Sequence, residues 1–166
     1  MKQLSKIKRY TETASIIEFA EFILGELNGR TYVNYQALDL MRIPRLVPGI
    51  FVYDIKNSPD KFKIHYCGTK IDWFYGQNMA NKAPLDHYPE FELVNEIYMK
   101  SVENKQPCHT LRNTHMDNDL ADKYTKIETV LVPCSQNGCD IDYTVGYADY
   151  RSSQAPMDPQ LQLIDP

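Results

Sequence analysis

Four aromatic residues, Tyr66, Trp73, Phe74 and Tyr75, gather around the end of one predicted strand and in the short predicted helix that follows it. Large aromatic side chains often line small-molecule pockets, and a buried tyrosine hydroxyl usually forms a hydrogen bond. We therefore expect Trp73 and Phe74 to close over a ligand and Tyr66 to donate a hydrogen bond to it. Packing of the same residues into an ordinary core is the alternative.

Other residues of the predicted elements complete the candidate ligand site. Thr129 and Tyr147 lie on two predicted strands that we expect to be neighbours, and Tyr98 lies on a predicted helix. A register error of one residue would turn a strand's side chains to the opposite face of the sheet. The full candidate set is Tyr66, Trp73, Phe74, Tyr98, Thr129 and Tyr147.

The histidines and cysteines do not have the spacing of a metal site. His109 and His115 share one strand face, but six residues of extended chain separate them by roughly 20 Å. Cys134 and Cys139 flank a predicted turn; we expect reduced thiols, while a disulfide or metal use stays open. We predict no metal ligand, and no residue type or spacing identifies a cofactor.

No pattern in the sequence indicates catalysis. The chain has no phosphate-binding glycine loop and no Gly-x-Ser-x-Gly elbow. Cys67 lacks an evident base, and we predict no catalytic residue. The acidic residues of one stretch are not spaced as a calcium loop, so we expect them to lie in a solvated loop: Asp117, Asp119, Asp122 and Glu128.

Length and composition indicate one ordinary globular domain. The chain has 166 residues, of which 43% are hydrophobic and 24% charged, with a formal net charge of −4. That acidic balance argues against nucleic acid as the main partner, because nucleic-acid binding usually needs a basic face. No apolar run is long enough for a membrane span and no secretory signal is evident, so we expect a cytoplasmic protein. We expect a basic N-terminal tail (1–12), one domain (13–150) and a flexible C-terminal tail (151–166).

A first helix is predicted over residues 13–27, because apolar residues recur there at helical spacing. Ser15 and Glu18 fit a capping box at its start. Phe22 and Leu24 extend the apolar surface beyond one stripe, which favours contact with a partner subunit. The candidate interface of this homodimer is Ile16, Phe19, Phe22 and Leu24.

The remaining pattern predicts a sheet built mainly from hairpins. Strands are expected over 50–55, 62–67, 108–116, 124–132 and 142–150, with helices over 69–75 and 90–104. In the second strand, alternation places Phe62, Ile64 and Tyr66 on one face. The third strand has no apolar face, which is typical of an edge. This order predicts an α+β domain with an antiparallel sheet.

The order of elements resembles a PAS domain, and local segments resemble a bacterial PAS-like family of stand-alone proteins. Three segments carry the resemblance: Leu46 to Asp54 as a first strand, Phe62 to Thr69 as a second strand ending in Gly-Thr, and Glu128 to Tyr147 as a closing hairpin. Histidine stands at position 65, where the family often has arginine. The resemblance implies a five-stranded antiparallel sheet with helices on one face, preceded by an N-terminal helix. It also implies a cavity that in some members holds haem, flavin or a small organic ligand.

These observations favour three hypotheses. The first is a sensory domain that binds a small molecule or a signalling protein and transmits its state through the N-terminal helix. The second is a dimeric interaction module whose core is filled by its own side chains. The third is a small enzyme on a cone-shaped α+β fold, for which Asp54 or Asp72 with His65 is the candidate pair.

Overall fold

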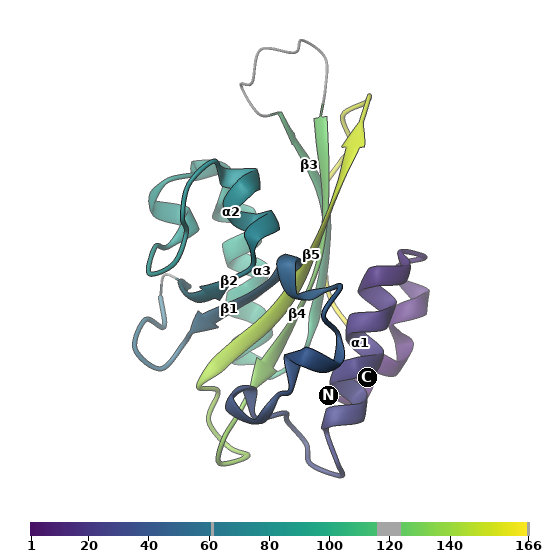
Figure 1. Cartoon of the computed structure of the whole chain (residues 1–166), viewed down its shortest axis with the longest axis vertical. Coiled ribbons are helices and arrows are strands. Elements are labelled where there is room, and N and C mark those ends of the chain that lie inside the picture. The colour runs from purple at the N-terminus through teal and green to yellow at the C-terminus, as the bar shows by residue number, and fades with distance from the viewer. Residues whose placement is uncertain (61, 116–123, 166) are drawn as a thin grey trace.

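The computed structural model describes residues 1–60, 62–115 and 124–165 and contains a six-stranded antiparallel sheet (Figure 1). The strands lie in the order β2-β1-β5-β4-β3-β6. Their bounds are β1 Ile50–Asp54, β2 Lys63–Cys67, β3 Cys108–His115, β4 Tyr124–Cys134, β5 Tyr143–Ser153 and β6 Gln160–Leu163. The α-helices are α1 Ala14–Glu26, α2 Thr69–Tyr75 and α3 Glu92–Glu103, and a 3-10 helix, η1, spans Lys2–Arg9.

The α+β class and the antiparallel sheet predicted from the sequence are confirmed, and the arrangement is PAS-like. The helix predicted over 69–75 forms at those residues, and Gly76 ends it with a left-handed backbone at φ 65°. Such a conformation at a helix C-terminus favours glycine because it has no Cβ. The order of strands and helices on which the prediction relied is therefore present in the fold.

Helices cover both faces of the sheet, whereas the PAS resemblance implied one covered face. Helices α2 and α3 lie against one face, and η1 with α1 lies against the other (Figure 1). Two hydrophobic clusters fill these layers, one beneath α1 and one beneath α2 and α3. We call the first face the α1 face and the second face the cavity face.

The two chain ends differ from the predicted tails. Residues 2–9 form η1, which buries Leu4 and Ile7, one helical turn apart, against the α1 face. At the other end, β5 continues to Ser153, and β6 pairs antiparallel with β3. Ile164 is fully buried. At both chain ends, apolar residues that share one face pack against the core. They are few and lie among polar residues, so their spacing was not recognised in the sequence.

The sixth strand changes the position of β3 in the sheet. We predicted β3 as an edge strand, but β6 pairs with it from Cys108 to Leu111. The pairing ends at Leu111, and beyond it the Asn113 side chain bonds the chain ahead of β6, accepting from Met157 N at 3.2 Å and donating to Ala155 O at 2.7 Å. The part of β3 that follows Leu111 borders the site described below.

The predicted dimer face of α1 is largely internal. Ile16 and Phe19 are fully buried and Phe22 is 8% exposed, all within the core beneath α1. Leu24 is the one of the four candidates that is only partly buried. One apolar face of α1 packs on the sheet and the other on the segment after the helix. These two contacts explain the broad apolar surface that suggested a partner subunit.

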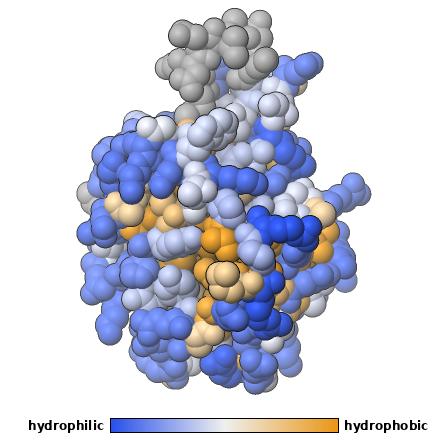
Figure 2. All heavy atoms as spheres, in the orientation of Figure 1, coloured by the Kyte–Doolittle hydropathy of each residue, from blue (hydrophilic) through white to orange (hydrophobic). Residues whose placement is uncertain are grey.

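On the face seen in Figure 2, hydrophobic residues gather in the middle, over the strands and between the two helical layers, and hydrophilic residues surround them. The large apolar side chains that the described residues expose most are Met41, Trp73 and Leu93. In the part of the chain that the structure describes, no helix is both long and apolar enough to cross a membrane.

Candidate functional site

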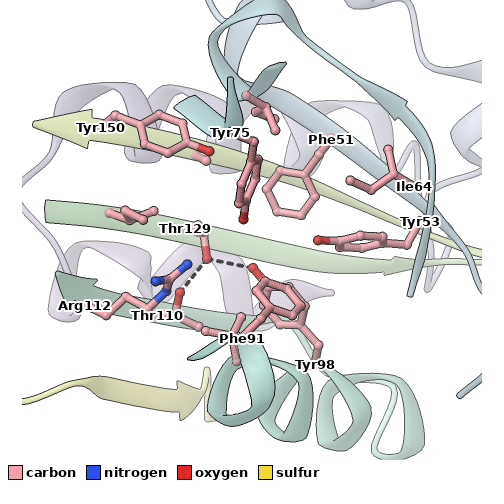
Figure 3. Close-up of a pocket in the computed structure, with 14 residues that line it drawn as sticks. Phe51, Tyr53, Ile64, Tyr75, Phe91, Tyr98, Thr110, Arg112, Thr129 and Tyr150 are labelled. Atoms are coloured by element: carbon pink, nitrogen blue, oxygen red, sulfur yellow. Dashed lines mark hydrogen bonds between the residues drawn. The ribbon is translucent and has the colours of Figure 1, made fainter. Parts of the chain in front are cut away.

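A small cavity lies between the sheet and the helices α2 and α3 (Figure 3). Its volume is about 30 Å³. Every strand from β1 to β5 and both helices contribute to it, because their inward-facing residues alternate along the cavity face. The lining residues are Phe51, Tyr53, Ile64, Ile71, Tyr75, Phe91, Val94, Tyr98, Thr110, Arg112, Ile127, Thr129, Ala148 and Tyr150.

A chain of hydroxyl groups crosses the floor of the cavity. Thr110 and Thr129 are paired across β3 and β4, and their hydroxyl oxygens are 2.6 Å apart. The Tyr98 hydroxyl, from α3, lies 3.1 Å from the Thr129 hydroxyl (Figure 3). These three groups satisfy one another, which allows polar side chains to be buried at this depth.

Three further tyrosine hydroxyls point toward the same space from Tyr53, Tyr75 and Tyr150 (Figure 3). Burial raises the pKa of Tyr75 to about 12 and raises the pKa of Tyr53 and Tyr150 well above the ordinary value. The nearby Arg112 guanidinium acts in the opposite direction on all three. At neutral pH these phenols are therefore protonated hydrogen-bond donors.

Aromatic rings make the wall opposite β3 rigid. Tyr98 is the centre of this packing, with ring centroids at 5.8 Å from Phe62 and 5.9 Å from Phe91. The Phe51 ring lies directly over Gly146 of β5, where an added Cβ would stand 2.2 Å from its Cζ atom. Glycine at 146 therefore lets Phe51 approach the sheet and form the cavity wall.

Only part of the predicted ligand site comes together here. Of the six candidate residues, the structure places Tyr98 and Thr129 among those that line the cavity. Phe74 is buried just outside it, with its ring 4.7 Å from that of Tyr150. Trp73, in contrast, is 82% exposed and lines no part of the cavity. Helix α2 has a single inward face, so these two consecutive residues cannot both point into the core.

Tyr66 and Tyr147 lie on the α1 face. Tyr147 stacks on Phe19 of α1 at 5.8 Å, because odd-numbered residues of β5 face α1. For Tyr66, the β1–β2 register shifts between Val52 and Tyr53, so that Val52 pairs with Tyr66 and Tyr53 with Ile64. This bulge at His65 turns Tyr66 away from the face that Ile64 shares, which simple alternation cannot predict.

Sequence reasoning missed Arg112, Thr110, Tyr53 and Tyr150 as site residues. Thr110 and Arg112 lie two and four residues after Cys108 on β3, so strand alternation places all three side chains on the same face. This spacing identifies Thr110 and Arg112 as inward-facing once the buried face is known. Nothing in the polar pattern of β3 indicated which face was inward, since both faces carry polar groups. The choice follows from the pairing of Thr110 with Thr129.

The α1 face carries a second polar cluster that the sequence did not predict. Glu128, expected in a solvated loop, is 3% exposed on β4 and accepts a hydrogen bond from His109, which is fully buried, at 2.9 Å. The other Glu128 oxygen accepts from Thr13 at 2.5 Å and from Arg151. We call His109, Glu128, Arg151 and Thr13 the buried ion network. Asp117, Asp119 and Asp122 lie outside the described residues.

The buried ion network stabilises the charged form of Glu128. Burial alone would raise the pKa of this carboxyl, but hydrogen bonds from His109, Thr11 and Thr13 outweigh it and lower the pKa to about 2. Thr13 is the N-cap residue of α1, so the carboxylate also lies at the positive end of that helix. The network therefore ties the start of α1 to the sheet.

The two polar clusters lie back to back in the sheet. Thr129 faces the cavity and Glu128, the adjacent residue of β4, faces α1. The same holds for Thr110 and His109 on β3. Because successive strand residues point to opposite faces, a shift of β3 or β4 at the cavity moves the buried ion network as well.

The remaining reactive side chains form no second site among the described residues. The four cysteines are free thiols, and no group of three or more His, Cys, Asp or Glu in the described ranges could hold a metal ion. The Cys67 thiol donates to Asp72 at 3.1 Å, and burial raises its pKa to about 12. His65 packs against the rings of Tyr35 and Tyr143, and among the described residues no hydrogen bond or ion pair joins it to Asp54 or Asp72, the two hypothesised partners.

Comparison with known proteins gives likenesses of structure and none of sequence. No protein-family model matches the chain, and no curated protein matches it. A light-oxygen-voltage protein of Rhodobacter sphaeroides is 10% identical, with a TM-score of 0.47, over 68% of each chain. The PAS domain of BvgS from Bordetella pertussis is 12% identical, with a TM-score of 0.47, over 66% of this chain and 83% of that one.

An RNA-binding light-oxygen-voltage receptor is 16% identical with a TM-score of 0.49, over 68% of this chain. The matched region spans only 33% of that receptor. At these identities the likeness concerns architecture only. The strand order β2-β1-β5-β4-β3, with α2 and α3 between β2 and β3, is the feature of this chain that makes its architecture PAS-like.

Proposed function

We propose that this chain is a PAS-like sensory domain that binds a small molecule on the cavity face and transmits occupancy through the sheet to α1. The observation that carries the proposal is the convergence of three tyrosine hydroxyls and the Arg112 guanidinium on one enclosed space. Polar groups that converge in an aromatic-lined pocket are the usual composition of a ligand site. The output path rests on the adjacency of Thr129 and Glu128 in β4.

The size of the cavity restricts the ligand. A volume of about 30 Å³ is far below the 300 Å³ or more of pockets for drug-sized molecules. A buried water needs about 10–15 Å³ on the same measure, so the closed cavity holds roughly two. The ligand is therefore small, or only one end of it enters the cavity.

A screen against a metabolite library tests the input. We expect at least one compound to raise the melting temperature of the wild-type protein, because a ligand that binds only the folded state stabilises it. Ala148 lines the cavity, so Ala148→Val should fill part of the space and weaken that response. Ala37→Val, in an exposed 3-10 turn, is the matched control and should keep it. Failure of every compound to shift the wild-type melting temperature contradicts the proposal.

Hydrogen exchange tests the output. With a compound from the screen bound, we expect changed amide exchange at residues 13–17, where the buried ion network holds the start of α1. Glu128→Gln should reduce this change in amide exchange. The compound should still raise the melting temperature of the variant as it does that of the wild type. Exchange changes confined to α2 and α3 would contradict transmission through the sheet.

A second function is favoured by the same small volume. A cavity of about 30 Å³ also fits a protein whose core is filled by its own side chains and which works as a dimeric interaction module. Phe22 is buried, so Leu24→Glu is the variant of α1 that tests this without a core substitution. Under this alternative the wild type sediments as a dimer and Leu24→Glu as a monomer. An equal mass for both excludes an α1-mediated dimer.

A further inference from the structure

Arg112 is the one cation among the residues that line the cavity, and its charge is not paired in an ion pair. Among the described residues, no carboxylate forms an ion pair with its guanidinium. Its neighbours across the cavity are the phenols of Tyr53, Tyr75 and Tyr150 (Figure 3). Exposed Glu90 lines the two adjoining spaces with Arg112 but forms no ion pair with it, so the half-buried guanidinium has lost water without a direct ion-pair partner, which costs free energy.

The balance of donors and acceptors points the same way. A guanidinium supplies five N–H donors and no acceptor, and each protonated phenol adds one donor and one acceptor oxygen, that of Tyr75 accepting from Arg112. The hydroxyl acceptors in the cavity, at Thr110 and Thr129, are already bonded to each other and to Tyr98. The donors of Arg112 and the three phenols outnumber the phenol oxygens that could accept from them, so a ligand that brings acceptors and negative charge complements the site, and a planar carboxylate matches the guanidinium geometry.

Space beyond Arg112 provides room for the rest of a ligand. An outer groove of about 170 Å³ also has Arg112 in its wall, and a narrow space of about 10 Å³ lined by Arg112 and Phe91 adjoins them. The groove exists because β6 stops pairing with β3 at Leu111, opposite Gln160. Its wall is largely apolar, through Leu93, Val94, Pro159 and Leu161.

We propose that the cavity and the outer groove together bind a monocarboxylate with a short apolar tail. The carboxylate accepts from Arg112 and from the Tyr53, Tyr75 and Tyr150 hydroxyls, and the tail lies on Leu93 and Leu161 in the groove. Exposed Glu90 also lines the groove and repels a second negative charge, which selects monoanions over dianions. This inference rests on the proposed sensory function and names the class of ligand.

Butyrate and benzoate are the probes, and their neutral isosteres butyramide and benzamide are the matched ligands. Calorimetric titration of the full chain is expected to show binding of the carboxylates at least 10-fold tighter than that of the amides. Arg112→Gln removes the charge-assisted hydrogen bonds and should weaken butyrate about 10- to 100-fold while leaving butyramide unchanged. Arg45→Gln, at an exposed arginine outside the site, is the control and should bind butyrate as the wild type does.

Two further measurements protect the test against misfolding. Tyr150→Phe keeps the ring and removes one donor, so it should weaken butyrate binding several-fold with an unchanged circular dichroism spectrum.

Succinate, which carries a second carboxylate, should bind more weakly than butyrate because of Glu90. Glu90→Gln should reduce the difference in affinity between the two acids.

The outcomes separate this inference from the sensory function itself. Carboxylate binding that Arg112→Gln leaves unchanged, or amides that bind as tightly as acids, overturns the ligand class while the small-molecule site stands. If neither the carboxylates nor the amides bind, and no compound of the metabolite screen stabilises the protein, both proposals are wrong.

Discussion

The two faces of the sheet use buried polar groups in opposite ways. On the α1 face, Glu128 has partners for both oxygens, and these partners come from β3, β5 and the start of α1. On the cavity face, Arg112 and three phenols converge, and no carboxylate among the described residues forms an ion pair with Arg112. The same strands supply both sets. The comparison indicates that the cluster with paired charges stabilises the fold, although His109 Nδ1 has no hydrogen-bond partner among the described residues, whereas the cavity face holds an unpaired cation that a ligand would complete.

The largest effect is expected from breaking the buried ion network. Glu128→Ala leaves buried His109 and the Arg151 charge without their shared acceptor, which should cost about 3 to 4 kcal/mol of unfolding free energy. Urea unfolding at pH 7 measures it. Glu96→Ala, at an exposed position of α3, is the control and should stay within about 0.5 kcal/mol. Equal losses in both variants would mean that the network contributes nothing to stability.

The pH dependence of stability should show the same carboxyl. The pKa of Glu128 is lowered from 4.5 to about 2 in the folded state, so its contribution is present above pH 4.5 and is lost as the pH falls toward 2. That window corresponds to about 3 kcal/mol at most. Unfolding free energies measured between pH 5 and pH 2 should fall less steeply in Glu128→Gln. Parallel curves for wild type and variant would refute the assignment.

On the cavity face, the expected loss comes from packing instead of charge. Gly146→Ala places a methyl group against the Phe51 ring, which must move, and should cost about 2 kcal/mol. It should also change the cavity wall and weaken any bound ligand. Gly25→Ala, where no atom lies within 4 Å of the added Cβ, should instead be neutral or stabilise α1 by up to about 1 kcal/mol. A stable Gly146→Ala protein with unchanged binding would contradict the close packing of Phe51.

The smallest effect is expected at Trp73. Because its side chain is 82% exposed, Trp73→Ala should change the unfolding free energy by less than about 0.5 kcal/mol and leave ligand binding unchanged. Its buried neighbour gives the contrast, since Phe74→Ala should cost more than about 2 kcal/mol. Loss of ligand binding in Trp73→Ala would contradict this expectation and support the sequence-based prediction that Trp73 belongs to the ligand site.

The elements of the fold were predictable where short-range patterns specify them. The segments that became α1, α2 and β1 to β5 were located within a few residues, because apolar periodicity and turn residues act locally. The capping box was not confirmed: Ser15 donates to Asp149 and Glu18 pairs with Arg45, while Thr13 is the N-cap. Those side chains found partners far away in the sequence that no local pattern contains.

The sequence by itself therefore determined the α+β class, the order of the elements and two members of the cavity, Tyr98 and Thr129. Only the tertiary structure decided which face each remaining side chain occupies. A single bulge at His65 moved Tyr66 to the α1 face, and the pairing of β3 with β4 brought Thr110 and Arg112 inward. The physical reason is that strand alternation has a period of two, so the face depends on register, and register is set by contacts between distant segments.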